Sequence, residues 1–242
     1  MIMSKTGVDM GKYVNSSKFF DYSQVTQPQN STDYLSSIVI GEHPVPPKEY
    51  LITFSKEVEN YCVGVVDMVN STKISATIGP SRVSTYYQIF LNSMSRIVNK
   101  LGGVVIKNIG DCLLYYFPES NNLQSKDGFV SSLECALTMM DSHELICKKL
   151  KEVGLPCVDY RISLDYGSVF LMRSSVDPSL DMIGPPVNMC SKINRCAPKN
   201  GVVIGGDLHQ IVKSFKEYSF SQVTGCHIGL KCTYPVYSLR RK

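Results

Sequence analysis

Apolar positions along the chain follow patterns that are typical of alternating strands and helices. The run Tyr61–Asp67 is a short apolar segment that ends on a carboxylate, which predicts a buried strand. Apolar residues then recur at helical spacing from Pro80 to Leu101 and a Gly-Gly pair follows, which predicts a long helix. Val104–Lys107 and Cys112–Phe117 are predicted strands joined by a tight turn, so they form a hairpin. A second amphipathic helix is predicted over about residues 127–152.

The remaining residues continue this alternation with shorter elements. A strand pair is predicted at Val158–Leu164 and Ser168–Met172, followed by a helix from about Val187 to Cys196. The last predicted elements are a strand at Val202–Ile204, a helix at Asp207–Ser214 and β segments at Tyr218–Val223, His227–Lys231 and Val236–Leu239. The order β-α-β-β-α-β predicts an α+β fold: a ferredoxin-like sheet with helices on one face, plus C-terminal β/α additions.

Residues 1–55 differ in composition from the rest of the chain. Residues 15–37 are rich in Ser, Asn, Gln, Thr and Tyr, and a His-Pro-Val-Pro-Pro stretch follows at 43–47. We therefore predict an N-terminal extension over 1–55, regulatory or partly disordered, and one folded domain over 56–242.

Composition and charge exclude several classes of protein. The 242 residues are 43% hydrophobic and 19% charged, so the chain can bury a core. The net charge of +4 is small and Lys and Arg form no basic stripe, so we expect no nucleic-acid partner. The longest apolar runs are too short to cross a bilayer, and the first residues lack an apolar signal core. We therefore expect a cytoplasmic protein with no membrane span.

The nine cysteines and four histidines show no spacing that is typical of a metal finger. No two cysteines form a CxxC pair, and several lie inside apolar strand or helix patterns, where a free thiol behaves as a small hydrophobic group. We expect these cysteines to be reduced and buried.

Two aspartates follow predicted strands. Asp67 ends the first strand, and Asp111 lies in the hairpin turn after Gly110. Taken alone, each is better explained as a turn residue. In a β-α-β-β unit, however, the first strand and the hairpin are neighbours, so both carboxylates can meet at one end of the sheet. Two close carboxylates repel each other unless a cation lies between them, and Mg²⁺ binds one or two carboxylates together with substrate phosphates.

Three segments around these residues resemble a known family. Val66–Thr72, Ile106–Asp111 and Leu180–Lys192 are similar, in order and spacing, to the three signature blocks of class III adenylate/guanylate cyclases. The resemblance covers roughly residues 57–240. It implies a cyclase homology domain that converts ATP to 3′,5′-cyclic AMP and pyrophosphate. It also implies two divalent metal ions, Mg²⁺ or Mn²⁺, and a homodimer with shared active sites.

The resemblance implies roles for individual residues. Asp67, Asp111 and the Met68 carbonyl would bind the metal ions, and Ser71 and Thr72 would face the β- and γ-phosphates. The other implied roles are base recognition by Lys107 and Asp181, ribose orientation by Asn188, transition-state stabilisation by Lys192 and triphosphate binding by Lys231. A Lys donor and an Asp acceptor complement the N1 acceptor and the N6 donor of adenine, which favours ATP over GTP.

The sequence departs from the family pattern most clearly at Lys192, where most active members have Arg. Lys keeps the positive charge but lacks the planar guanidinium that holds two oxygens at once. Arg195 is predicted on the same helix face as Asn188 and Lys192, so one hypothesis is that Arg195 reaches the substrate phosphates instead. Smaller departures are Ser71 in place of Phe, Pro185-Pro186 in place of smaller residues, and Cys232 in place of the Gly that follows Lys231.

Other functions are compatible with these residues. Lys192 leaves open a catalytically weak or inactive cyclase-fold module that binds nucleotide or dimerises. A guanylate cyclase is a second alternative, against which Lys107 argues, and an unrelated ferredoxin-like regulatory domain is a third. The stretch Gly205-Gly-Asp207 resembles the start of the diguanylate cyclase motif, but Leu208 and His209 follow, so we interpret it as the start of a helix.

Overall fold

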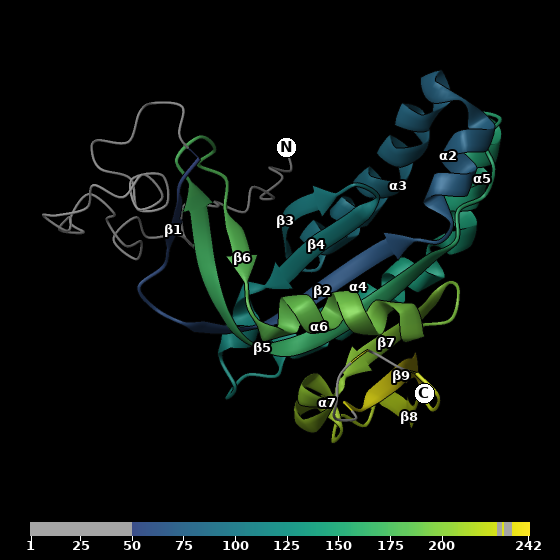
Figure 1. The fold of residues 1–242 in the computed structure, drawn as a ribbon. Helices are drawn as coiled ribbons and strands as arrows, with labels where there is room; N and C mark the ends of the chain where they lie inside the picture. The colour runs from purple at the N-terminus through teal and green to yellow at the C-terminus, as the bar shows by residue number, and fades with distance from the viewer. Residues whose placement is uncertain (1–49, 227–228, 230–233) are drawn as a thin grey trace, which may run out of the picture. The chain divides into compact units, whose positions relative to one another are not determined.

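The computed structural model describes residues 50–226, 229 and 234–242 (Figure 1). The helices and strands are β1 (Ile52–Phe54), β2 (Glu59–Met68), α2 (Ser71–Ile78), α3 (Pro80–Lys100), β3 (Val104–Ile109), β4 (Cys112–Phe117), η4 (Pro118–Asn121), α4 (Asp127–Asp141), α5 (His143–Glu152), β5 (Tyr160–Ser174), β6 (Asp181–Ile183), α6 (Pro185–Ile193), η5 (Asn194–Cys196), β7 (Gly201–Gly205), α7 (Gly206–Val212), β8 (Tyr218–Gln222) and β9 (Val236–Arg241).

These elements divide into two compact units. The larger contains residues 59–169 and 183–242, and the smaller has 50–58 and 170–182 as its described residues. In the smaller unit, β1 pairs in antiparallel fashion with the end of β5, where Ile52 lies opposite Ser174. The range 1–55 predicted as an extension thus includes β1. Residues 1–49 lie outside the described part of the chain.

The sheet of the larger unit has the strand order β3-β4-β2-β5-β7-β9-β8. Its first four strands pair in antiparallel fashion throughout, which is the arrangement that a β-α-β-β-α-β order produces in a ferredoxin-like fold. β7 adds to β5 in parallel, and the antiparallel strands β9 and β8 follow it. The predicted fold class, including the C-terminal additions, is therefore confirmed.

Alternation along the strands sends side chains to opposite faces of this sheet. In β2, Cys62, Val66 and Met68 belong to the main core, which also contains most of the buried residues of α3, α4 and α5. In β7, Val203 points to the other face, where it packs with Ile193 of α6. The two long predicted helices thus cover one face, and α6, from the additional segment, covers the other.

Several predicted element boundaries are wrong. The helix predicted at 127–152 is two helices, α4 and α5, which meet at Ser142, where the Ser142 hydroxyl donates to the Thr138 carbonyl. The strand pair predicted around residues 166 and 167 is one continuous strand, β5, because Gly167 continues the ladder opposite Tyr61 of β2. α2 was not predicted as a separate helix. Most of the predicted β segment His227–Lys231 lies outside the described residues.

The cysteines are not all unpaired, which corrects the expectation of reduced thiols. Disulfides join Cys147 to Cys157 and Cys196 to Cys226. Sequence separations of 10 and 30 residues do not show which thiols meet, because the packing of helices and connections decides it. The free cysteines among the described residues are Cys62, Cys112, Cys135 and Cys190, and all except the half-buried Cys112 are buried.

A buried carboxylate fastens α7 to the sheet. Asp165 in β5 is 1% exposed. Its Oδ1 accepts hydrogen bonds from the amides of Tyr166 (2.9 Å) and Leu208 (3.4 Å), and its Oδ2 accepts one from the Tyr234 hydroxyl (2.8 Å). Burial is the main cause that raises the pKa of Asp165 to about 6, and these three hydrogen bonds limit the rise.

We expect Asp165 to make the free energy of unfolding fall as pH rises from about 4 to about 6. Its folded pKa lies above the ordinary value of 3.8, so its stabilising contribution is complete below that value and is lost through about pH 6. The difference between the ordinary pKa of 3.8 and the folded pKa of about 6 corresponds to about 3 kcal/mol of unfolding free energy. Urea unfolding of the wild type and of Asp165→Asn across this range measures the effect. The Asn side chain keeps an oxygen that accepts from the Tyr166 and Leu208 amides and can donate to the Tyr234 hydroxyl. The variant should therefore lack the fall in unfolding free energy between pH 4 and pH 6. Parallel pH profiles for the two proteins would contradict the role given to Asp165.

Candidate active site

The end of β2 and the β3–β4 hairpin lie side by side in the sheet. Val66 is paired with Leu113, so the next position, Asp67, lies beside Cys112 at the start of β4. Ile109 is paired with Cys112, which leaves Gly110 and Asp111 as a two-residue turn. Gly110 has a φ of 63°, a conformation that suits glycine and the tight turn. The structure therefore brings Asp67 and Asp111 to the same end of the sheet.

The Asp67 carboxylate responds to its surroundings, which include Asp111. Burial, and then repulsion from Asp111, raises the pKa of Asp67, although the Arg161 guanidinium and a hydrogen bond from the Met68 amide act in the opposite direction. Burial and the charges of Asp67 and Asp111 also raise the pKa of the Cys112 thiol to about 12. Two neighbouring carboxylates supply the oxygen donors that Mg²⁺ and Mn²⁺ prefer. These residues therefore fit a divalent metal site.

Arg161 is a residue of this site that sequence reasoning missed. It lies in β5 directly opposite Asp67 of β2, so the two side chains share a face of the sheet. Its Nε is buried and makes no hydrogen bond in the described part of the chain. Only the register of β2 and β5 identifies this pair, because 94 positions separate the two residues and neither lies in a motif with the other.

The turn after β2 leads into the N-terminus of α2. Asn70 adopts a left-handed conformation, with φ 59° and ψ 30°, and α2 begins at Ser71. The amides of the first turn of a helix have no partner within the helix and point to its N-terminus, which favours anionic groups. Ser71 is half-buried and Thr72 is exposed. The turn is fastened by a hydrogen bond from the Val69 amide to the carbonyl of Asp159, the residue before β5 (2.8 Å).

The two residues predicted to read the base lie on different elements. Lys107 is exposed in β3 and is paired with Leu114 of β4, after an irregularity in the ladder between Val105 and Lys107. Asp181 begins β6, and its Oδ1 accepts a hydrogen bond from the Met182 amide (2.8 Å). They belong to the two different compact units, Lys107 to the larger and Asp181 to the smaller.

The helix α6 carries the residues predicted to act on the ribose and the transition state. Asn188 is exposed and Lys192 is half-buried. The predicted helix 187–196 is displaced toward the N-terminus: α6 begins at Pro185 and ends at Ile193, and a 3₁₀ turn, η5, follows. Arg195 therefore lies in η5 and is exposed, and its Nε donates a hydrogen bond to the Lys192 carbonyl (3.2 Å). Lys231 lies outside the described residues.

Buried polar contacts fix α6 on the sheet. The Ser163 hydroxyl in β5 donates to the Cys190 carbonyl (2.9 Å), and the Cys190 thiol donates to the Val63 carbonyl (3.2 Å). At the end of the helix, the Asn194 side-chain amide donates to the Arg161 carbonyl (3.2 Å). The buried face of α6 is thus held by β2 and β5, and its opposite face presents Asn188.

Comparison with known families identifies the class of protein that this fold and site define. Residues 54–240 match the model of the adenylate and guanylate cyclase catalytic domain. The chain therefore belongs to the class III cyclase family, as its three motifs predicted. Among the described residues, no helix is both long enough and apolar enough to traverse a membrane.

The curated relatives are named as cyclases of different nucleotides. The chain is 24% identical over 198 residues to a cytidylate cyclase of Staphylococcus aureus, and 24% identical over 196 residues to a photoactivated adenylate cyclase subunit beta-like protein of Euglena gracilis. These matches cover 78% and 71% of this chain, but only 46% and 22% of those two proteins. The chain thus spans less than half the length of these relatives.

Solved structures share the fold at low sequence identity. The adenylyl cyclase CyaB from P. aeruginosa has a TM-score of 0.68 and 17% identity, over 80% of this chain and 97% of that one. The guanylate cyclase domain of RhGC from Catenaria anguillulae, solved in complex with GTP, has a TM-score of 0.66 and 18% identity, over 77% and 99% of the two chains. Since these two structures belong to an adenylyl and a guanylate cyclase, the fold alone leaves the base unassigned.

Proposed function

We propose that this protein is an adenylate cyclase that converts ATP to 3′,5′-cyclic AMP and pyrophosphate at active sites shared by a homodimer. The observation that carries the proposal is the meeting of Asp67 and Asp111 at one end of the sheet, where burial and then repulsion from Asp111 raise the pKa of Asp67. A pair of carboxylates held in this way favours a bound divalent cation. Family membership supports a cyclase as the enzyme class.

The residues around this pair would bind and orient the triphosphate. Asp67, Asp111 and the Met68 carbonyl would hold two divalent ions, which supply charge stabilisation to the phosphates and make the 3′-hydroxyl a better nucleophile. Ser71 and Thr72 would direct their amides and hydroxyls to the β- and γ-phosphates, because they start α2.

The other half of the site would come from the second protomer. Asn188 would orient the ribose, and Lys192 would neutralise charge that develops on the phosphoryl oxygens. Lys231, which follows β8 in the sequence, would bind the triphosphate. A homodimer follows because one chain carries both halves, and a twofold axis then creates two equivalent sites.

Lys107 and Asp181 would read the base. A Lys ammonium donates to N1 of adenine, and an Asp carboxylate accepts from the N6 amino group. Guanine presents a donor at N1 and an acceptor at O6, so Asp181 and Lys107 would have to exchange partners there. This pair supports ATP as the substrate, whereas the cytidylate cyclase relatives at 24% identity make CTP the second candidate.

The experiment that tests the proposal is an incubation of the purified chain with Mn²⁺ and each of ATP, GTP and CTP in turn. Cyclic nucleotide and pyrophosphate are measured separately. We expect product from ATP at the highest kcat/KM. A highest value with CTP or GTP would reject the assignment of the base but keep the cyclase, and nucleotide binding without product would support a non-catalytic module.

A variant of the base pocket sharpens this experiment. We expect Lys107→Met, which keeps the length of the side chain but removes the ammonium donor, to lower kcat/KM for ATP by about 10- to 100-fold, as for the loss of one charged hydrogen bond. The value for any minor substrate should change less. Lys100→Met, at the exposed C-terminal end of α3, is the matched control and should leave the ratio of the values unchanged. Equal losses for all triphosphates would place Lys107 away from the base.

A further inference from the structure

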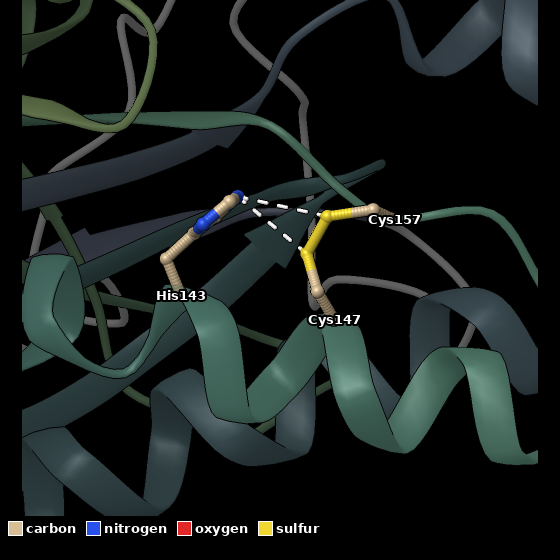
Figure 2. A group of neighbouring side chains, drawn as sticks. All are labelled: His143, Cys147 and Cys157. Carbon is tan, nitrogen blue, oxygen red and sulfur yellow. Dashed lines mark hydrogen bonds between the residues drawn. A yellow bond between two sulfur atoms is a disulfide. The ribbon is translucent and has the colours of Figure 1, made fainter.

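One histidine and two cysteines gather outside the candidate active site, between α5 and the start of β5. Figure 2 shows the His143 ring directed at both sulfurs of the Cys147–Cys157 disulfide. His143 Nε2 lies 3.5 Å from the Cys147 sulfur and 3.7 Å from the Cys157 sulfur. Within the described part of the chain, these three residues are the one group whose possible metal-binding atoms all lie within 4.8 Å of one another.

The local fold explains why these side chains converge. His143 is the first residue of α5 and Cys147 is four positions later, so both occupy one face of the helix. The chain then turns back, and Cys157 approaches that face from the connection that leads into β5. The ring of Tyr160 packs against His143, with ring centroids 5.7 Å apart, which helps to fix the imidazole.

A carboxylate stands beside this group. Asp159 Oδ1 is 3.8 Å from His143 Nε2. The carboxylate is held in place by the Asn200 side-chain amide, which donates to Oδ1 (2.8 Å), and by the Lys199 ammonium, which donates to Oδ2 (3.1 Å). A fourth donor is therefore already positioned next to the imidazole.

We propose that His143, Cys147 and Cys157, with Asp159 as fourth donor, bind a divalent cation of the zinc class when the disulfide is reduced. In tetrahedral zinc sites the Zn–S and Zn–N distances are about 2.3 and 2.05 Å, which separates a sulfur from a nitrogen ligand by about 3.6 Å. The two observed N–S distances of 3.5 and 3.7 Å match this separation. The two sulfurs have to move apart, to about 3.8 Å, and Asp159, whose carboxylate lies outside the group of three, has to approach the ion.

The disulfide and the metal ion use the same sulfur atoms and exclude each other. A dithiol reductant breaks the S–S bond by giving two electrons and two protons, and becomes a disulfide itself. The cation then displaces both thiol protons as it binds the two thiolates. His143 must then carry its proton on Nδ1, so the hydrogen bond that Nε2 can donate to the Val158 carbonyl (3.0 Å) is given up and the Nε2 lone pair is free to bind the ion.

Two comparisons within the molecule make the assignment specific. Cys196 and Cys226 are also joined, but among the described residues they belong to no group of three metal-binding side chains. The candidate active site offers oxygen donors from Asp67 and Asp111, which suit Mg²⁺ and Mn²⁺, whereas sulfur and imidazole donors select zinc-class ions. The two sites should therefore take different metals.

An ion at this site would reinforce the connection that supports the candidate active site. The Cys157 carbonyl accepts a hydrogen bond from the Tyr86 hydroxyl (3.3 Å), and the Asp159 carbonyl accepts one from the Val69 amide, two positions after Asp67. An ion that binds the folded chain and not the unfolded chain stabilises the fold by mass action. We therefore expect zinc to raise the Tm of the reduced protein, whether or not the protein turns over a nucleotide.

The test uses the full chain, reduced with a phosphine and titrated with Co²⁺ without oxygen. One equivalent should produce thiolate-to-cobalt charge-transfer absorption, which oxygen donors at Asp67 and Asp111 cannot give, and Zn²⁺ should displace it. The absorption should be lost in Cys147→Ser and in Cys157→Ser. Asp159→Asn should weaken Co²⁺ binding by about 10- to 100-fold, as for other supporting ligands of metal sites.

The matched control is the double variant Cys196→Ser/Cys226→Ser, which should keep the full absorption. A wild type whose thiols titrate as free but which gives no such absorption overturns the proposal. So does absorption that survives in the Cys147→Ser/Cys157→Ser double variant or disappears in the control. The titration of the wild type alone decides the matter if a variant fails to fold.

Discussion

Asp67→Asn is expected to lower cyclase turnover by more than about 1,000-fold while the protein remains folded. Loss of a single transition-state donor costs about 100- to 1,000-fold in kcat, and under the proposed function Asp67 helps to hold two ions rather than to make one hydrogen bond. The side chain is partly buried beside Asp111, and neutral Asn removes their repulsion. The Tm without metal should therefore not fall. The measurement is the initial rate of pyrophosphate release with Mn²⁺ and ATP.

The controls for this prediction come from the same chain. Asp111→Asn should cause a loss of similar size, and the double variant should be little worse than either single one, because the two carboxylates act as a unit. Asp127→Asn removes an exposed carboxylate from the first turn of α4 and should leave the rate unchanged. Turnover within about tenfold of the wild type in Asp67→Asn would show that the carboxylate pair is not the metal site.

Lys192→Ala is expected to lower kcat by about 100- to 1,000-fold and to change KM much less. The ammonium would act on charge that develops in the transition state, so its removal affects the chemical step more than binding of the ground state. Lys192→Arg should retain turnover, because guanidinium keeps the charge and adds a second parallel donor. Steady-state kinetics with ATP on the three proteins measures these differences.

Arg195→Ala decides whether Arg195 takes part instead. Arg195 is exposed in η5 and directs its Nε to the Lys192 carbonyl, a contact within its own helix end. We therefore expect Arg195→Ala to change kcat by less than about threefold, the scale of an exposed side chain. A large loss in Arg195→Ala together with normal turnover in Lys192→Ala would exchange the roles of the two residues.

Local patterns were sufficient where an element is stabilised by its own sequence. The helical spacing from Pro80 to Leu101 predicted α3 closely, because four of its residues are buried on one stripe. The Gly110-Asp111 turn was recognisable because a two-residue hairpin turn needs backbone angles that few residue types other than Gly, Asn and Asp adopt. The break between α4 and α5 at Ser142 was missed, because Ser is tolerated in helices and Ser142 keeps right-handed backbone angles, with φ −78° and ψ −4°.

The sequence by itself determined the family, the fold class and the position of Asp67 and Asp111 at neighbouring strand ends, because motif order and strand-end positions can be recognised in the linear chain. Only the tertiary structure decided which side chains lie next to those aspartates and which other side chains lie next to one another. It placed Arg161 opposite Asp67 through the register of β2 and β5, and it brought Cys157 to His143 across a turn of the chain. The physical reason is that side-chain chemistry depends on distances of a few ångströms. Sheet register and helix packing set these distances, and the spacing of residues along the chain does not.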